Sequence, residues 1–311
     1  MNFRNGLQLL VFVLPLALAL LLSMAAASQI KILPGSQWLK PVHVNSVDDL
    51  ERLFTDLAYD WPLVAGPVVP RLLVQSLPSE LNNGLSVARK KALFLRVLLP
   101  VVLAENQHIR QQRAWLQRLL LDGLPAVDSL AWRQLQRLAA DYRVNGDLNE
   151  PVWQQQLLQR IDEVPVALVL AQAANESGWG TSRFVQQANN LFGHWTWQAD
   201  QGLVPLQRDV GKKHRVRVFP TLRSSVQAYL YNLNTGRAYK RLRQLRAILR
   251  DNDQPLDGQH LAAGLIHYSE RGVDYVDEIR VLIRGNHLAH FETVGLREGT
   301  WRLAIGLRTE D

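Results

Sequence analysis

The sequence predicts a mainly α-helical fold with one small β-hairpin lobe inserted among the helices. Most of the chain after residue 88 carries apolar side chains every three or four residues, which is the spacing of an amphipathic helix. One stretch, residues 166–174, is almost wholly apolar, so the helix that it predicts is buried on all sides. By contrast, residues 203–206 and 214–219 alternate or run apolar over a few positions, which predicts two short strands.

Composition and charge narrow the class of protein. The 311 residues are 47% hydrophobic and 20% charged, enough for a domain of about 140 residues and a second, smaller unit. Lys and Arg number 35 against 28 acidic residues, a balance that suits nucleic acid, a membrane surface or a polyanionic substrate. The chain has no cysteine, and His287 and His290 lack a third ligand at helical spacing, so we expect no metal site and no other cofactor.

The first 28 residues have the features of a signal peptide or an N-terminal anchor. Arg4 precedes an apolar run from Leu7 to Met24, and three alanines at 25–27 form a small-residue cleavage site. The run approaches the ~20 residues that span a bilayer, so an uncleaved anchor in the inner membrane is the alternative to cleavage. Pro15 and the alanines favour cleavage. In both cases we expect an exported protein of the periplasm or cell envelope, which argues against a nucleic-acid partner.

Residues 29–149 form the predicted helical N-terminal region. Its first part, 29–86, is rich in proline and serine and predicts loops and short helices. Residues 88–121 and 128–142 predict two helices, the first of them kinked or divided by Pro100. Glu105 and His108 lie three residues apart in the first helix, where we expect a solvated face rather than a catalytic pair. The loop R-V-N-G-D-L-N at 143–149 is the predicted domain boundary.

Residues 150–292 form the predicted second domain, and 293–311 a tail without a clear pattern. Before the lobe the periodicity predicts helices at 152–161 and 165–177 and a short one at 181–188. After the lobe, Ser224 and Gln227 make a capping box that opens the next helix. Three more helices are expected at 237–250, 259–268 and 274–284, and the many arginines and lysines of the first are expected to form a solvated basic face.

Glu176 is the candidate general acid of the chain. It lies at the C-terminal end of the apolar helix, which Gly178 and Gly180 terminate because glycine accepts the left-handed conformation. Partial burial and the negative end of the helix dipole both disfavour the charged carboxylate, so its pKa should be raised. A general acid at neutral pH needs this environment. Gln172 is four residues earlier and shares the same helix face.

At these residues the sequence resembles a known family. A-Q-A-A-N-E-S-G-W-G-T-S-R-F followed by A-N-N-L-F-G is similar to the signature of bacterial peptidoglycan N-acetylglucosaminidases (glycoside hydrolase family seventy-three), in particular the Bax-like branch of Gram-negative bacteria. The resemblance covers roughly residues 152–291. It implies a lysozyme-like catalytic domain that cuts the β-1,4 bond after N-acetylglucosamine in the glycan strands of peptidoglycan, with Glu176 as the catalytic acid.

The second catalytic group has two candidate sources. Glycosidases usually pair the acid with a second carboxylate, and the acids near the lobe are Asp200 and Asp209. In the alternative, substrate-assisted route, the acetamido group of the sugar attacks the anomeric carbon, and a side chain orients that group. Tyr268 matches the family's C-terminal tyrosine motif, but here the motif reads Y-S-E-R-G-V-D-Y and is one residue longer, so Tyr275 competes for the role.

Further residues are expected to bind the sugar chain. Trp195 and Trp197 follow N-N-L-F-G where the family usually has small or aliphatic residues, and indole faces suit the apolar face of a pyranose. The remaining substrate-binding candidates, which accompany Glu176 or belong to the motif, are Gln172, Asn189, Asn190, Phe192 and Tyr275.

Two other functions compete with this hypothesis. A muramidase or lytic transglycosylase also carries a glutamate on a helix, but it usually shows G-L-M-Q downstream, where this chain has N-N-L-F-G. A non-catalytic protein that binds or scaffolds the cell wall is the third candidate. We also expect the N-terminal region to pack on the catalytic domain, because its helices are too apolar to bury their side chains against each other alone. The oligomeric state cannot be derived from the sequence.

Overall fold

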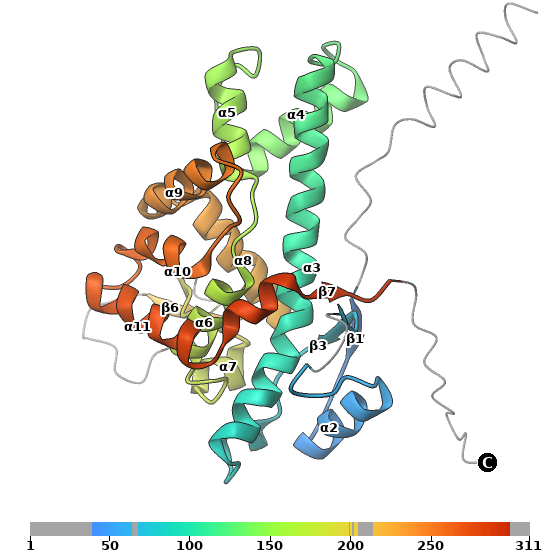
Figure 1. Ribbon diagram of the computed structural model, residues 1–311, viewed down its shortest axis with the longest axis vertical. Helices are drawn as coiled ribbons and strands as arrows, with labels where there is room; N and C mark the ends of the chain where they lie inside the picture. The colour runs from blue at the N-terminus through green and yellow to red at the C-terminus, as the bar shows by residue number, and fades with distance from the viewer. Residues whose placement is uncertain (1–38, 64–67, 199, 201, 205–213, 299–311) are drawn as a thin grey trace, which may run out of the picture.

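The computed structural model describes residues 39–63, 68–198, 200, 202–204 and 214–298. Within these residues the predicted mainly α fold with a small inserted β-lobe is confirmed (Figure 1). None of the described helices is long and apolar enough to cross a membrane. The predicted signal peptide or anchor at 1–28 lies outside the described residues.

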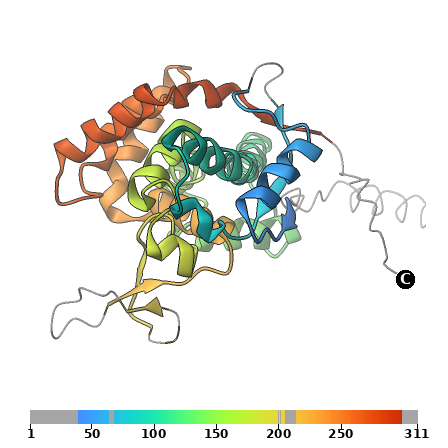
Figure 2. The same ribbon diagram turned by 90° about the horizontal axis from the view of Figure 1, so that it is seen from below.

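The longest element is α3 (Val87–Asp122), which runs along the whole height of the molecule in Figure 1 and lies near its centre in Figure 2. Ser86 begins it, because its Oγ accepts a hydrogen bond from the Arg89 amide. Pro100 lies inside the helix but does not divide it, contrary to one of the two predicted outcomes. The residues around Pro100 are buried, and this packing offsets the backbone hydrogen bond that proline cannot make.

Short strands and one helix pack beside α3 at the N-terminal end of the chain. They are β1 (Lys40–Val42), α2 (Val47–Asp56), β2 (Val68–Val69), β3 (Leu72–Val74) and the 3-10 helix η1 (Ser79–Asn82). β1 and β3 pair in parallel, with Pro41 opposite Leu73. The strands were not predicted, since two or three residues are too few to show the alternation of a strand.

The predicted helices on either side of the 143–149 loop are α4 (Leu130–Asp141) and α5 (Pro151–Arg160). The buried helix follows as α6 (Val166–Ser177). Its N-cap, Pro165, has no side-chain acceptor, and Glu292 takes that role by accepting from the Val166 and Ala167 amides at 3.0 and 2.9 Å. Gly178 ends α6 in the left-handed conformation with φ 58°, as its position in the sequence predicted.

The inserted lobe follows α7 (Arg183–Ala188) and contains three antiparallel strands where two were predicted. They are β4 (Trp195–Thr196), β5 (Gly202–Leu203) and β6 (Arg215–Arg217), with β6 in the centre. Figure 2 shows the lobe projecting away from α3. α8 (Leu222–Thr235) follows, and its cap is Thr221, whose Oγ1 accepts from the Ser224 amide, rather than the predicted Ser224.

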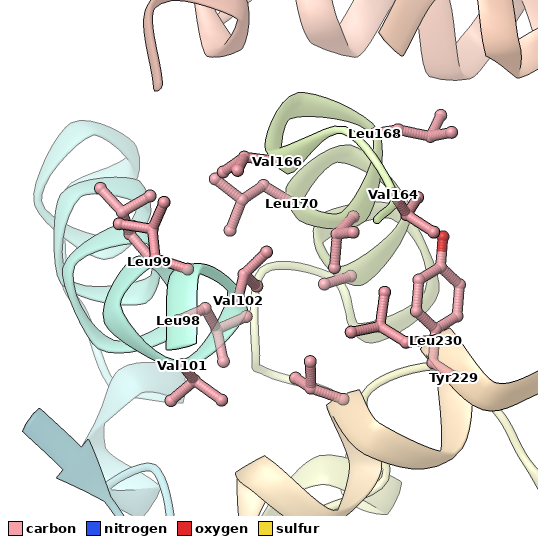
Figure 3. Close-up of a cluster of buried hydrophobic side chains, with 14 of the residues drawn as sticks. Leu98, Leu99, Val101, Val102, Val164, Val166, Leu168, Leu170, Tyr229 and Leu230 are labelled. Carbon is pink, nitrogen blue, oxygen red and sulfur yellow. The ribbon is translucent and has the colours of Figure 1, made fainter. Parts of the chain in front are cut away.

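Helices α3, α6 and α8 meet in the hydrophobic core. Figure 3 shows Leu98 and Val102 of α3, Leu170 of α6 and Leu230 of α8 among the side chains of this cluster. This single cluster has Leu39 as its first residue in the sequence and Val294 as its last. It includes side chains from both sides of the 143–149 loop. The expectation that the N-terminal region packs on the later helices is therefore confirmed.

The chain ends in a group of helices on the other side of α6. They are η3 (Arg237–Tyr239), α9 (Lys240–Asp251), α10 (Gly258–Leu261), η4 (Ala262–Leu265), α11 (Val273–Gly285) and η5 (Leu288–Thr293). The last described element is β7 (Gly295–Leu296), which pairs in parallel with β2, so the beginning of the predicted tail is ordered against the N-terminal region.

The predicted solvated basic face of α9 is wrong at Arg243, Arg246 and Arg250, of which Arg243 is 7% exposed and donates to the Leu233 and Gly236 carbonyl oxygens. Arg246 is only 1% exposed, and its guanidinium donates to the carbonyl oxygens of Asp162 and Glu163 at 3.0 and 2.9 Å. Arg250 forms an ion pair with Asp162 at 2.8 Å. Burial opposes ionisation of Asp162, but Arg246 and Arg250 hold the pKa of its carboxyl below the usual value. These arginines therefore fix the segment that leads into α6.

Candidate active site

A cavity of about 1560 Å³ opens at the C-terminal end of α6. The lobe forms one wall, α8 forms another, and Tyr239 and Tyr268 come from the C-terminal helices. Of the residues predicted from the sequence, six line this cavity: Glu176, Phe192, Trp195, Trp197, Asp200 and Tyr268. The volume exceeds the usual ~300–1,000 Å³ of a small-molecule pocket, as expected for a site that accepts an extended ligand.

Glu176 is half-buried and lines this cavity. Its Oε1 accepts a hydrogen bond from the Tyr275 hydroxyl at 2.8 Å and a longer one from the Asn175 amide at 3.4 Å. Burial raises the pKa of Glu176 above the usual glutamate value, and the two hydrogen bonds offset this only in part. The C-terminal end of α6 adds a negative dipole, which acts in the same direction as burial. The geometry therefore favours a carboxyl group that keeps its proton and can donate it.

A chain of three hydrogen bonds leads to Glu176 from the core. The Tyr229 hydroxyl donates to Gln172 Oε1, Gln172 Nε2 donates to the Tyr275 hydroxyl at 2.8 Å, and Tyr275 donates to Glu176. Burial raises the pKa of Tyr229 well above the usual tyrosine value, so its proton stays in place. Gln172 is fully buried with both ends of its amide bonded, so it holds Tyr275 rather than lining the cavity.

Sequence reasoning missed Tyr229. It occupies an apolar position of the α8 stripe at 226, 229, 230 and 233, and nothing in the sequence separates it from an ordinary core aromatic residue. Its ring stacks on Phe192 with centroids 3.9 Å apart, and this contact brings its hydroxyl to Gln172. The role of the hydroxyl depends on tertiary contacts alone.

Both tyrosines of Y-S-E-R-G-V-D-Y reach the site. Their rings stack with centroids 5.3 Å apart and planes 10° apart. Tyr275 is in the first turn of α11 and contacts Glu176 directly, whereas the Tyr268 hydroxyl donates to the Phe192 carbonyl oxygen at 3.1 Å. Tyr268 therefore lines the cavity. Tyr275 does not line it but holds the Glu176 carboxyl group through its hydrogen bond.

The lobe presents two indole rings to the cavity. Trp195 and Trp197 are 53% and 76% exposed, high values for aromatic side chains of this size. Trp195 stacks one face on His214, with ring centroids 3.7 Å apart, and this contact fixes its orientation. Asp200 is exposed on the same wall. Asp209, the other predicted second carboxylate, lies outside the described residues.

Asn189 and Asn190 shape the wall and do not line the cavity. Asn190 is 1% exposed, and its side-chain amide donates to the His194 and Arg217 carbonyl oxygens, both at 2.8 Å. Asn189 ends α7 in the left-handed conformation and donates to the Phe219 carbonyl oxygen at 3.2 Å. Both residues thus tie the N-N-L-F-G segment to the lobe, which agrees with the tight backbone geometry expected of asparagine.

Charged and titratable residues that the sequence did not single out also line the cavity. Arg143 and Arg217 contribute guanidinium groups. His194 is neutral at neutral pH, because burial, followed by the nearby Arg217, lowers its pKa to about 4. Among the described lining residues, the only carboxylates are Glu176 and Asp200.

The expectation of a solvated face at Glu105 is wrong. Glu105 is 4% exposed, forms an ion pair with Arg223 and accepts from Gln227 Nε2 at 3.1 Å. His108 is half-buried, and burial lowers its pKa. The two residues line a second cavity, away from Glu176. No group of three or more His, Cys, Asp or Glu side chains in the described part of the chain is arranged to hold a metal ion.

Comparisons with known proteins identify the family of the chain. Residues 153–288 match the Glucosaminidase family, described as mannosyl-glycoprotein endo-beta-N-acetylglucosaminidase, and the match contains α6 and the lobe. The chain is also 33% identical over 213 residues to protein bax of Escherichia coli (strain K12), covering 68% of this chain and 74% of that protein. No solved structure matches the chain significantly. The chain therefore belongs to the glucosaminidase family, whose members are glycosidases.

Proposed function

We propose that the chain is an exported endo-β-N-acetylglucosaminidase that cleaves the β-1,4 bond after N-acetylglucosamine in peptidoglycan. The observation that carries this proposal is Glu176, a half-buried carboxyl group with a raised pKa that lines a large open cavity. A glycosidase needs such a group to protonate the oxygen that leaves the anomeric carbon. The cavity is large enough for several sugar units, and its exposed tryptophans offer flat apolar faces for pyranose rings.

In the proposed reaction, Glu176 gives its proton to the glycosidic oxygen as the bond to the anomeric carbon breaks. Tyr275 holds the Oε1 atom, so the other carboxyl oxygen is the one that carries the proton toward the substrate. Gln172 and Tyr229 keep Tyr275 in place through their hydrogen bonds. Because this support is buried, the acid needs little reorganisation during the reaction.

The second group in our proposal is the substrate's own acetamido group. Its carbonyl oxygen attacks the anomeric carbon and forms a bicyclic intermediate, which water then opens after Glu176, now a carboxylate, removes a proton from that water. Tyr268 lines the cavity and is the side chain proposed to orient the acetamido group. Asp200 is exposed on the lobe, which suits contact with substrate better than burial next to the anomeric carbon.

The proposed location is the periplasm or the cell envelope. The apolar run of residues 7–24, followed by three alanines, supports export through a signal peptide or an N-terminal anchor. Peptidoglycan is found in that compartment, so location and substrate agree. Cell fractionation tests this proposal, and recovery of the full-length protein in the cytoplasm would contradict it.

Product analysis tests the reaction. Purified peptidoglycan is digested with the full mature chain, and the fragments are reduced and measured by mass spectrometry. We expect fragments with N-acetylglucosamine at the reducing end. Fragments that end in N-acetylmuramic acid would identify a muramidase, and anhydro-muramic ends would identify a lytic transglycosylase. Binding to peptidoglycan without any new ends would indicate a wall-binding protein and refute the enzyme.

A further inference from the structure

A second cavity, of about 710 Å³, adjoins the proposed active site along α8. It is formed by α3, the C-terminal end of α4 and α8. Gln227 and Tyr231, both exposed residues of α8, line this cavity and the active-site cavity alike. These two side chains therefore separate the two cavities. The second cavity is called the side cavity below.

The side cavity has both polar and apolar walls. Its lining includes the apolar side chains of Ile109 and Leu230, the amides of Gln112 and Gln227, the acidic groups of Glu105 and Asp141, and Tyr142. The Tyr142 hydroxyl donates to Gln112 Oε1 at 2.8 Å, which fixes the orientation of that amide. A lining that combines hydrogen-bonding groups with apolar side chains complements a peptide, which has a polar backbone and apolar side chains.

Arg143 lies where the two cavities meet. Its Nε donates to the Tyr231 hydroxyl at 2.9 Å, and its guanidinium lies over the Tyr231 ring at 5.1 Å from the centroid. Its carbonyl oxygen accepts from Arg160 at 2.7 Å. Within the described part of the chain, neither terminal nitrogen of its guanidinium has a hydrogen-bond partner, and the residue lines the active-site cavity.

Arg143 follows the end of α4 in the left-handed conformation, with φ +57°. The Val144 amide donates to the Ala139 carbonyl oxygen at 2.8 Å, which is the usual hydrogen-bonded end of an α-helix. This conformation directs the chain out of α4 while the side chain lies on Tyr231. The helix end thus fixes the backbone from which the Arg143 guanidinium reaches the active-site cavity.

A fixed cation has no partner in a chain of neutral N-acetylglucosamine units. In peptidoglycan, however, every second sugar carries a lactyl group, and the lactyl group carries a short peptide that ends in carboxylates. The lactyl group and the peptide could each present a carboxylate to the Arg143 guanidinium. The lactyl group alone would leave the side cavity empty, whereas a peptide is long enough to enter it.

We infer that the N-terminal region binds the peptide branch of peptidoglycan, with the branch in the side cavity and one of its carboxylates on Arg143. This inference rests on the proposed function. Arg143 precedes the residues that match the Glucosaminidase family, 153–288, so the region before that domain would contribute substrate selection. The enzyme would then prefer glycan strands that still carry peptides over strands from which an amidase has removed them.

The test compares two substrates, peptidoglycan glycan strands with their peptides and the same strands after amidase treatment. For the wild type we expect a higher kcat/KM on the peptide-bearing strands. Arg143→Gln should lower kcat/KM on these strands by ~10-fold, the size of one charge-assisted contact, and leave the stripped strands unchanged. Tyr231→Phe removes the acceptor that holds Nε and should give a smaller loss on the same substrate only.

The matched control is Arg137→Gln. Arg137 is an exposed arginine of α4 that lines neither cavity, so its replacement removes the same charge and should change neither rate. Equal loss on both substrates in Arg143→Gln would overturn the inference, since Arg143 would then bind the sugar chain or its lactyl carboxylate. No loss on either substrate would also overturn it. If the wild type cleaves neither substrate, the proposed function itself fails.

Discussion

Replacing Tyr275 by phenylalanine tests the hydrogen bonds that surround the candidate acid. The substitution removes one hydroxyl that donates to Glu176 at 2.8 Å and accepts from Gln172 at 2.8 Å. The ring and its stacking on Tyr268 remain. Two effects should follow, one on the pKa of Glu176 and one on the stability of the fold.

The effect on the pKa has a definite sign. The Tyr275 hydrogen bond stabilises the charged carboxylate and so lowers the pKa of Glu176, against the larger effect of burial. Without it, the pKa rises further, and the acid keeps its proton to a higher pH. The alkaline limb of the kcat/KM profile, along which the proton is lost, should therefore move to higher pH in Tyr275→Phe.

The effect on stability follows from Gln172, which is fully buried. Its Nε2 loses its acceptor, and an unsatisfied buried donor costs ~1–3 kcal/mol of unfolding free energy. For a chain of this size each kcal/mol lowers Tm by roughly 2–4 °C, so the melting temperature should fall by about 2–12 °C. Thermal denaturation followed by circular dichroism measures this change.

Tyr268→Phe is the matched control. Its hydroxyl donates to a backbone carbonyl oxygen and not to Glu176, so its loss should cost only ~0.5–1.5 kcal/mol and leave the alkaline limb in place. The rate itself should fall, because Tyr268 is proposed to orient the acetamido group. An unmoved alkaline limb in Tyr275→Phe, or an equal movement in both variants, would refute the assignment of Tyr275 as the partner of the acid.

Four further substitutions test other parts of the account. Asp200→Asn, and likewise Asp209→Asn, should keep activity within about 3-fold in lysis assays if the acetamido group assists; a loss as large as that of Glu176→Gln would identify that aspartate as the second carboxylate. Trp195→Ala should raise KM by ~2–10-fold through loss of one sugar-stacking face, and an unchanged KM would remove this ring from the substrate site. Glu292→Ala should lower the unfolding free energy by ~0.5–2 kcal/mol, because the first two amides of α6 lose their acceptor. The control is Glu270→Ala, at an exposed position, which should leave the unfolding free energy unchanged.

The sequence was sufficient to predict the long helices, because their apolar side chains repeat over ten or more residues. The single helix predicted at 259–268 is wrong, since the structure has the short α10 followed by the 3-10 helix η4. The bounds of α3, α4, α6 and α11 differ from the predicted ones by only one or two residues. The strands β1, β2, β3, β4 and β7 were missed, since each has two or three residues and no pattern can develop over that length. Pairing between β2 and β7 joins residues more than two hundred positions apart, which no local pattern can reveal.

The same distinction applies to the site. Glu176 could be predicted as the candidate acid because its setting, an apolar helix that ends at glycines, is formed by consecutive residues. Tyr229 and Arg143 were missed because their partners come from distant segments: Gln172 is 57 residues from Tyr229, and Tyr231 is 88 residues from Arg143. The basic face of α9 was misinterpreted for the same reason, since the acceptors of Arg246 belong to the segment before α6.

The turnover of Glu176→Gln on peptidoglycan tests the central claim most directly. The variant keeps the size of the side chain and an oxygen that can accept from Tyr275, so the fold and the melting temperature should be retained. The amide has no acidic proton to transfer, and the rate of appearance of new reducing ends should fall by ~10²–10⁴-fold. A folded Glu176→Gln protein that releases N-acetylglucosamine ends at nearly the wild-type rate would contradict the assignment of Glu176 as the general acid.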